Sequence, residues 1–164
     1  MPILLKNKHT LQVDEFYFKC SIGKNGRSKK KIEGDKKTPI GTFGIEHLYY
    51  RKDKINTFQT NLKCIQIKRN MGWCNDTKNL KKYNKLINID QKTSHEKLFR
   101  KDYKYDLLIP IKYNFKKKIA GKGSCIFIHI TKDYQPTAGC IALKKKDFLI
   151  MLKIINKNTI IKIY

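Results

Sequence analysis

One stretch, Ile126–Leu143, constrains the fold and the chemistry of this chain more than any other; it reads IFIHITKDYQPTAGCIAL. An apolar run carries His129, a polar loop follows, and a tight Gly139-Cys140 turn leads into a second apolar run. Short apolar runs bounded by turn residues are typical of buried strands. His129 and Cys140 lie on consecutive short elements, so a returning chain can bring them together. An imidazole beside a thiol can populate the thiolate, which makes the two residues a candidate base and nucleophile.

Similar short runs recur along the chain and predict further strands. They cover Phe16–Cys20, Thr42–His47, Cys64–Lys68, Asp106–Tyr113, Cys125–Thr131 and Asn158–Tyr164. Residues 1–22 suggest an opening hairpin, and Pro110 suggests that its strand is an edge or carries a bulge.

The segment Lys144–Asn156 has helical periodicity instead, with Phe148, Leu149, Leu152 and Ile155 on one face. The sequence therefore predicts a mainly β, β-rich α+β fold with one clear helix near the C-terminus. No repeat or linker divides the chain, and 164 residues suit one domain over 1–164.

Two segments show no clear periodicity. Gly23–Lys37 is rich in glycine and lysine, but it lacks the order of a phosphate-binding loop, so we expect a mobile surface loop. Asn70–Lys104 carries Trp73 and His95 in a long irregular stretch. Such a loop is uncommon unless it is functional. A short helix beginning near Ser94 is the alternative, and the residues alone leave the two open.

The net charge of +24 raises the possibility of nucleic-acid binding. Only four of the 37 basic residues are arginine, however, and the lysines are spread over nearly every segment. Recognition of phosphates and bases prefers the planar guanidinium group. The composition therefore favours the drift of an AT-rich genome, and we expect no nucleic-acid partner. Attraction to another anionic polymer is compatible with either origin.

The cysteines and histidines give no pattern of a metal site or a disulfide framework. Five cysteines leave at least one thiol unpaired within the chain, and none has CxxC spacing. Cys20, Cys64 and Cys125 lie in apolar runs, so we expect them to be buried structural thiols. The four histidines are scattered. We expect neither a metal nor a cofactor.

The first ten residues hold only a three-residue apolar run and no secretory leader. No run approaches the roughly 20 apolar residues of a membrane span. On these residues, the protein stays inside the cell, leaves by another route, or begins at a start that omits the leader.

Two motifs in order resemble the YkuD-like family of L,D-transpeptidase catalytic domains. The family places a histidine on a strand about a dozen residues before Ser/Thr-x-Gly-Cys, as His129 and Thr137-Ala138-Gly139-Cys140 do here. Upstream, Asp35-Lys36-Lys37-Thr38-Pro39-Ile40-Gly41-Thr42-Phe43 is similar to the family's Asp-x-x-Thr-Pro-x-Gly-x-Phe segment. The likeness spans about residues 14–164. It includes the segments around Trp73 and His95, which resemble those of a compact, single-domain subgroup of the family.

The resemblance implies curved, mixed sheets and acyl transfer on peptidoglycan stem peptides, for cell-wall cross-linking or remodelling and hence cell shape. Cys140 would attack the carbonyl between a diamino acid and a terminal D-residue, with His129 as the base. Thr137 and Gly139 would shape the turn and its oxyanion site, and His95 and Trp73 would line the substrate groove. The reaction needs no metal.

The resemblance leaves several alternatives open. Water in place of an amine would make the protein an L,D-endopeptidase or carboxypeptidase, and a non-catalytic basic protein that binds wall polymer or nucleic acid is a further reading. Many members carry Arg or Asn two positions after the cysteine, whereas this chain has Ala142. The family's place of work is the cell envelope or periplasm, which conflicts with the missing leader, and we expect a monomer.

Overall fold

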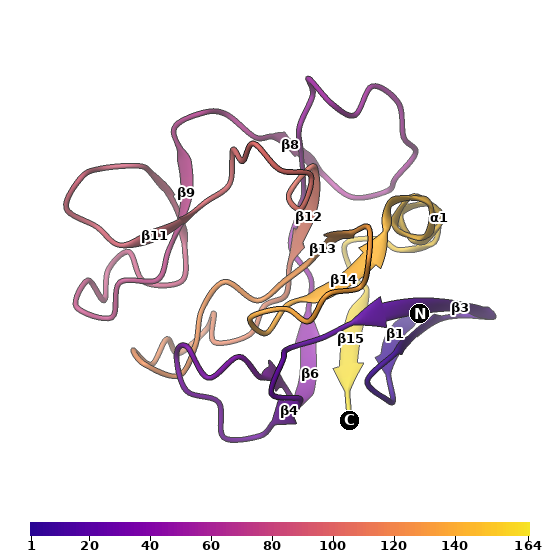
Figure 1. Cartoon of the computed structure of the whole chain (residues 1–164), viewed down its shortest axis with the longest axis horizontal. Coiled ribbons are helices and arrows are strands. Elements are labelled where there is room, and N and C mark those ends of the chain that lie inside the picture. Colours follow the sequence, from indigo (N-terminus) through magenta and orange to yellow (C-terminus); the bar gives the residue numbers. More distant parts are fainter.

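A curled ten-stranded sheet dominates the computed structural model, which describes residues 1–164 (Figure 1). Its strands are β1 (Pro2–Leu5), β2 (Thr10–Val13), β3 (Phe16–Ser21), β6 (Gly41–Gly44), β7 (Leu48–Tyr50), β8 (Cys64–Gln66), β12 (Leu107–Pro110), β13 (Phe127–Thr131), β14 (Ile141–Lys144) and β15 (Ile160–Ile163). Their order across the sheet is β6-β15-β1-β2-β3-β14-β13-β12-β7-β8. Three of the pairings are parallel, namely β1 with β15, β13 with β14, and β7 with β8. The predicted mainly β fold is confirmed.

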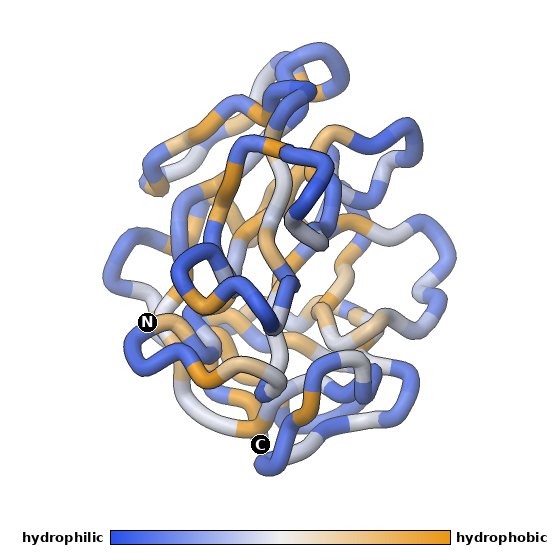
Figure 2. Tube along the Cα trace, turned by 90° about the vertical axis from the view of Figure 1, so that its left-hand side faces the viewer, coloured by the Kyte–Doolittle hydropathy of each residue, from blue (hydrophilic) through white to orange (hydrophobic).

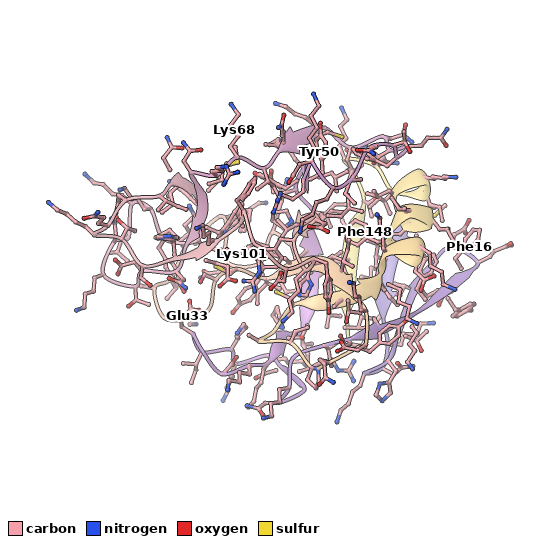
Figure 3. All side chains as sticks on the ribbon, turned by 45° about the horizontal axis from the view of Figure 1, so that its top comes forward. Phe16, Glu33, Tyr50, Lys68, Lys101 and Phe148 are labelled. Carbon is pink, nitrogen blue, oxygen red and sulfur yellow. The ribbon has the colours of Figure 1, made fainter.

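The single helix, α1 (Lys145–Ile154), covers one face of the sheet next to β13 and β14 (Figure 1). It buries Phe148, Met151 and Leu152, and Phe148 points from the helix into the molecule (Figure 3). Leu149, predicted on the same face, is only partly buried. The helix is too short and too charged to cross a bilayer.

The core is divided between two apolar clusters. The larger one lies between α1 and the sheet and contains 25 buried residues. The smaller one gathers eight buried residues around Trp73 and Phe127, and Cys140 belongs to it. Hydrophobic positions accordingly run through the interior of the trace, whereas the outer loops are hydrophilic (Figure 2). The nucleophile candidate is thus seated against packed aromatic side chains.

A second, three-stranded sheet lies beside the large one (Figure 1) and corrects the prediction for Asn70–Lys104. Its order is β10 (Leu86–Asn88), β9 (Met71–Cys74) and β11 (His95–Lys97). The segment is neither a long loop nor a helix start. Its strands are only three or four residues long, which is too short for period-two alternation to be visible in the sequence.

Three smaller predictions also need correction. β12 lies between β13 and β7, so Pro110 is not on an edge; it ends its strand, and its carbonyl accepts a hydrogen bond from Glu46 N at 2.9 Å. Cys64 is exposed, because β8 is the outermost strand. The opening hairpin continues as a three-stranded meander of β1, β2 and β3.

The loop Gly23–Lys37 is not only a surface loop. It contains β4 (Arg27–Ser28), which pairs in parallel with β5 (Thr38–Pro39). Its Lys31 side chain is buried, and Glu33 forms hydrogen bonds with residues more than 40 positions away. The many charged residues of this segment are typical of an exposed loop, so nothing in the sequence indicated these inward contacts.

Candidate active site

The two central parallel strands bring the predicted thiol and imidazole to one cavity. β13 and β14 are neighbours, with His129 opposite Ala142, and Cys140 stands directly before β14. Both predicted residues line a cavity of about 500 Å³. Its other walls come from the β4–β5 loop, from the end of β9, from β11 and the chain after it, and from the loop that joins β13 to β14. The small side chain of Ala142 also faces this space.

Cys140 is buried, and its Sγ lies among backbone groups. Phe127 N donates to the sulfur at 3.4 Å, and the thiol donates to the carbonyl of Cys125 at 3.2 Å. Burial raises the pKa of the Cys140 thiol to about 12, although the N–H of Phe127 opposes this shift. At neutral pH the thiol therefore keeps its proton until a base removes it.

His129 is buried beside Cys140's strand, and its Nδ1 lies 3.0 Å from the carbonyl oxygen of Ile130. A carbonyl can only accept, so Nδ1 carries the proton and Nε2 holds the lone pair. Burial lowers the pKa of His129 to about 4. With these pKa values, the thiol and the imidazole are both neutral at pH 7, and the thiolate forms only when a base removes the proton.

The turn before Cys140 is closed by its own side chains. Thr137 Oγ1 donates to the carbonyl of Cys140 at 2.6 Å and accepts from Gly139 N at 3.1 Å. Gly139 has φ 133°, and a Cβ there would lie 2.8 Å from the carbonyl oxygen of Lys37, so only glycine fits. The N–H of Gly139 is thus occupied. The N–H of Cys140 itself donates to no protein group.

Thr38, 101 residues from Gly139 in the sequence, fastens this turn to the rest of the protein. Its buried Oγ1 donates to Gly139 O at 2.9 Å and accepts from Gly23 N at 2.9 Å. The upstream Thr-Pro segment therefore acts as a positioning element. The motif match in the sequence marked Thr38, but its contact with the turn became visible only in the structure.

The structure places Trp73 and His95 away from the cavity lining. Trp73 is buried in the smaller cluster, where Nε1 donates to Asn84 Oδ1 at 2.9 Å and the ring meets Phe127 edge-on at 5.5 Å. His95 packs over Gly72, with Nδ1 2.7 Å from the carbonyl of Thr93. Both residues contribute packing near the site.

Three polar residues that were not predicted from the sequence also line the cavity, namely Glu96, Arg100 and Tyr105. The ring of Tyr105 meets that of His129 edge-on at 5.5 Å, and its hydroxyl donates to Glu96 Oε1 at 3.0 Å. Arg100 contacts both Glu96 at 3.2 Å and Asp102 at 2.6 Å. Glu96 lies in the three-residue strand β11 and the others lie in the irregular chain after it. None belongs to a recognisable motif, so no sequence signal pointed to them.

Comparison with known proteins places this geometry in a family. Structures of the helical cell shape determining protein Pgp2 from Campylobacter jejuni share the fold at 19% identity, with TM-scores of 0.56 and, for a point mutant, 0.54. The matches cover 99% of this chain, which spans about half (46%) of the solved Pgp2 chain. Curated proteins gave no match to the sequence. Residues 5–163 match the model of the YkuD family, the L,D-transpeptidase catalytic domain, and the chain belongs to that family.

Proposed function

We propose that this protein catalyses cysteine-dependent acyl transfer on peptidoglycan stem peptides, as a single catalytic domain over residues 1–164. The observation that carries the proposal is that one cavity is lined by His129, on β13, and by Cys140, directly before the adjacent parallel strand β14. Family membership supplies the reaction class. The reaction needs a nucleophile, a base and an oxyanion donor, and each has a candidate in this cavity.

In the first half-reaction, the thiol proton of Cys140 passes to Nε2 of His129 as Sγ attacks the carbonyl of the diamino acid. The oxyanion that forms is held by the free N–H of Cys140, since the N–H of Gly139 is already used by Thr137. Collapse of this intermediate breaks the peptide bond. His129 returns the proton to the departing amine of the terminal residue, and a thioester remains on Cys140.

The second half-reaction resolves the thioester. An amine from a second stem peptide attacks the acyl carbon and loses a proton to His129. The carbon–sulfur bond then breaks, the Cys140 sulfur takes the proton back from His129, and a cross-linked peptide leaves. Water in the same position gives a trimmed monomer instead. Cys140 and His129 serve both routes, so the acceptor that reaches the acyl carbon decides between transferase and hydrolase.

The test is incubation with tetrapeptide stems, followed by mass spectrometry for cross-linked dimers and trimmed monomers. We expect an acyl adduct on Cys140, both with the peptide and with an acylating β-lactam. Cys140→Ala should abolish the adduct and both products, and Cys64→Ala, at an exposed thiol on β8, is the matched control. Products that survive in Cys140→Ala would overturn the assignment of the nucleophile.

The proposed substrate is a polymer of the cell envelope, so we also propose that the protein works there. Fractionation of cells that express the native protein tests this, because the activity then co-purifies with the envelope fraction. Recovery of the active protein solely from the cytoplasm would contradict the proposal.

A further inference from the structure

Glu33 stands at the wall of the same cavity and is held in place without any cation. It is half-buried in the β4–β5 loop, on the side of the molecule that carries the three-stranded sheet (Figure 3). Its Oε2 accepts hydrogen bonds from the hydroxyl of Tyr83 at 2.5 Å and from Ser124 Oγ at 2.9 Å. Tyr83 is fully buried and Ser124 almost so, so both donors are fixed. The other oxygen, Oε1, has no hydrogen-bond partner in the protein.

Glu33 forms no ion pair, which is unusual for a carboxylate in so basic a protein. The chain has 37 basic and 13 acidic residues, so a carboxylate readily finds a partner. Lys31, two positions away and also in the cavity wall, turns to Asp35 at 2.7 Å. Arg100 is likewise engaged by Asp102 and Glu96. Lys31 and Arg100, two of the three cations in the cavity wall, are thus held by other carboxylates, and the third, Lys104, forms no ion pair with Glu33. Glu33 is left as an oriented anion that faces the substrate space.

We propose that Glu33 is a specificity residue that binds the ammonium group of a diamino acid side chain; this inference rests on the proposed function. A carboxylate with one oxygen fixed and the other free is a suitable receptor for an ammonium group, because the charge-assisted hydrogen bond is short and directional. The proposed substrate carries a diamino acid at the carbonyl that Cys140 attacks, so its side chain enters this cavity. The ammonium group belongs either to the donor stem or to the amine of the acceptor.

The binding test uses the Cys140→Ala protein, in which no chemistry follows binding. Calorimetry compares a tetrapeptide stem that has a free side-chain ammonium group with the same peptide acetylated at that nitrogen. We expect the free peptide to bind about tenfold more tightly. Adding Glu33→Gln should lower the affinity for the peptide with the free ammonium group to that for the acetylated peptide. The affinity for the acetylated peptide should not change. That unchanged affinity also shows that the variant is folded.

Two further variants separate a specific contact from a general change of charge. Asp133→Asn removes an exposed carboxylate from the rim of the same cavity and should leave the preference intact. Tyr83→Phe removes one donor to Glu33 and should weaken the preference only in part. Three outcomes would overturn the proposal. The Cys140→Ala protein that keeps Glu33 could bind the two peptides equally well or bind neither, or the preference for the free peptide could survive Glu33→Gln.

Kinetics with Cys140 present distinguish the two sources of the ammonium group. If it belongs to the donor, Glu33→Gln slows formation of the thioester with the free peptide. If it belongs to the acceptor, Glu33→Gln leaves that step unchanged and shifts the products from dimers toward trimmed monomers. A β-lactam carries no diamino acid, so its adduct on Cys140 tests the proposed function separately. A normal adduct without an ammonium preference counts against Glu33 alone.

Discussion

The turn Thr137–Cys140 and the three-stranded sheet of β9, β10 and β11 border the same cavity but are held in different ways. Side-chain hydrogen bonds fix the turn, and Thr38, 101 residues before Gly139 in the sequence, supplies one of them. Aromatic packing around Trp73 holds the sheet. The difference indicates that the turn positions the reacting atoms, whereas the sheet supports a wall. Substitutions in the two regions should therefore affect different measurements.

The largest effect on stability should come from Trp73→Ala, in the sheet. The substitution removes a buried ring that contacts Tyr49, Phe115 and Phe127, so we expect a loss of about 3–5 kcal/mol in the free energy of unfolding. Urea denaturation measures this. Leu80→Ala, at an exposed position, is the control and should change little. Adduct formation per folded molecule should stay within about threefold, since Trp73 does not line the cavity. A much larger drop in adduct formation would mean that Trp73 does line the substrate groove.

The second largest effect on stability should come from protonation of His129, which lines the same cavity as the turn. Its pKa is lowered to about 4 by burial, from 6.5, so the unfolded chain binds this proton more readily. The stability due to the neutral imidazole is complete above pH 6.5 and is lost as the pH falls toward 4, by about 3 kcal/mol. Denaturation at several pH values measures the slope.

The matched comparison for this slope is His129→Gln, which cannot be protonated in that range. Its stability should fall less steeply between pH 6.5 and 4, and the difference between the two proteins isolates His129 from the carboxylates. Parallel curves would mean that folding does not lower the pKa of His129. Acylation by the wild-type protein should persist down to about pH 5 for the same reason.

The elements that were predicted well are those whose local pattern matches their surroundings. Strand β13 and helix α1 face the core with long apolar runs or a clear helical face, so burial is visible in the residues themselves. The sheet around Trp73 was missed because its strands are short and its contacts are mostly with other segments. Glu33 was missed for a related reason, since its partners Tyr83 and Ser124 are 50 and 91 positions away.

A smaller effect is expected from Thr38→Val, which keeps the shape of the side chain and removes its hydroxyl. The carbonyl of Gly139 and the N–H of Gly23 then lose a buried partner, and we expect a loss of about 2 kcal/mol. The rate of adduct formation should fall as well, because the turn is no longer fastened. Thr42→Val, at an exposed position of β6, is the control. Unchanged acylation in Thr38→Val would show that the turn holds its own geometry.

The smallest effect should follow His95→Gln, again in the sheet. His95 is half-buried, and its one side-chain hydrogen bond joins Nδ1 to the carbonyl of Thr93. We expect a loss of less than about 1 kcal/mol in stability and an acylation rate within about twofold of the wild-type rate. Thermal denaturation and the β-lactam adduct measure the two quantities. Because His95 stands outside the cavity lining, a tenfold fall in acylation would require β11 to move toward the substrate, and the separation between a reactive turn and a supporting sheet would then be wrong.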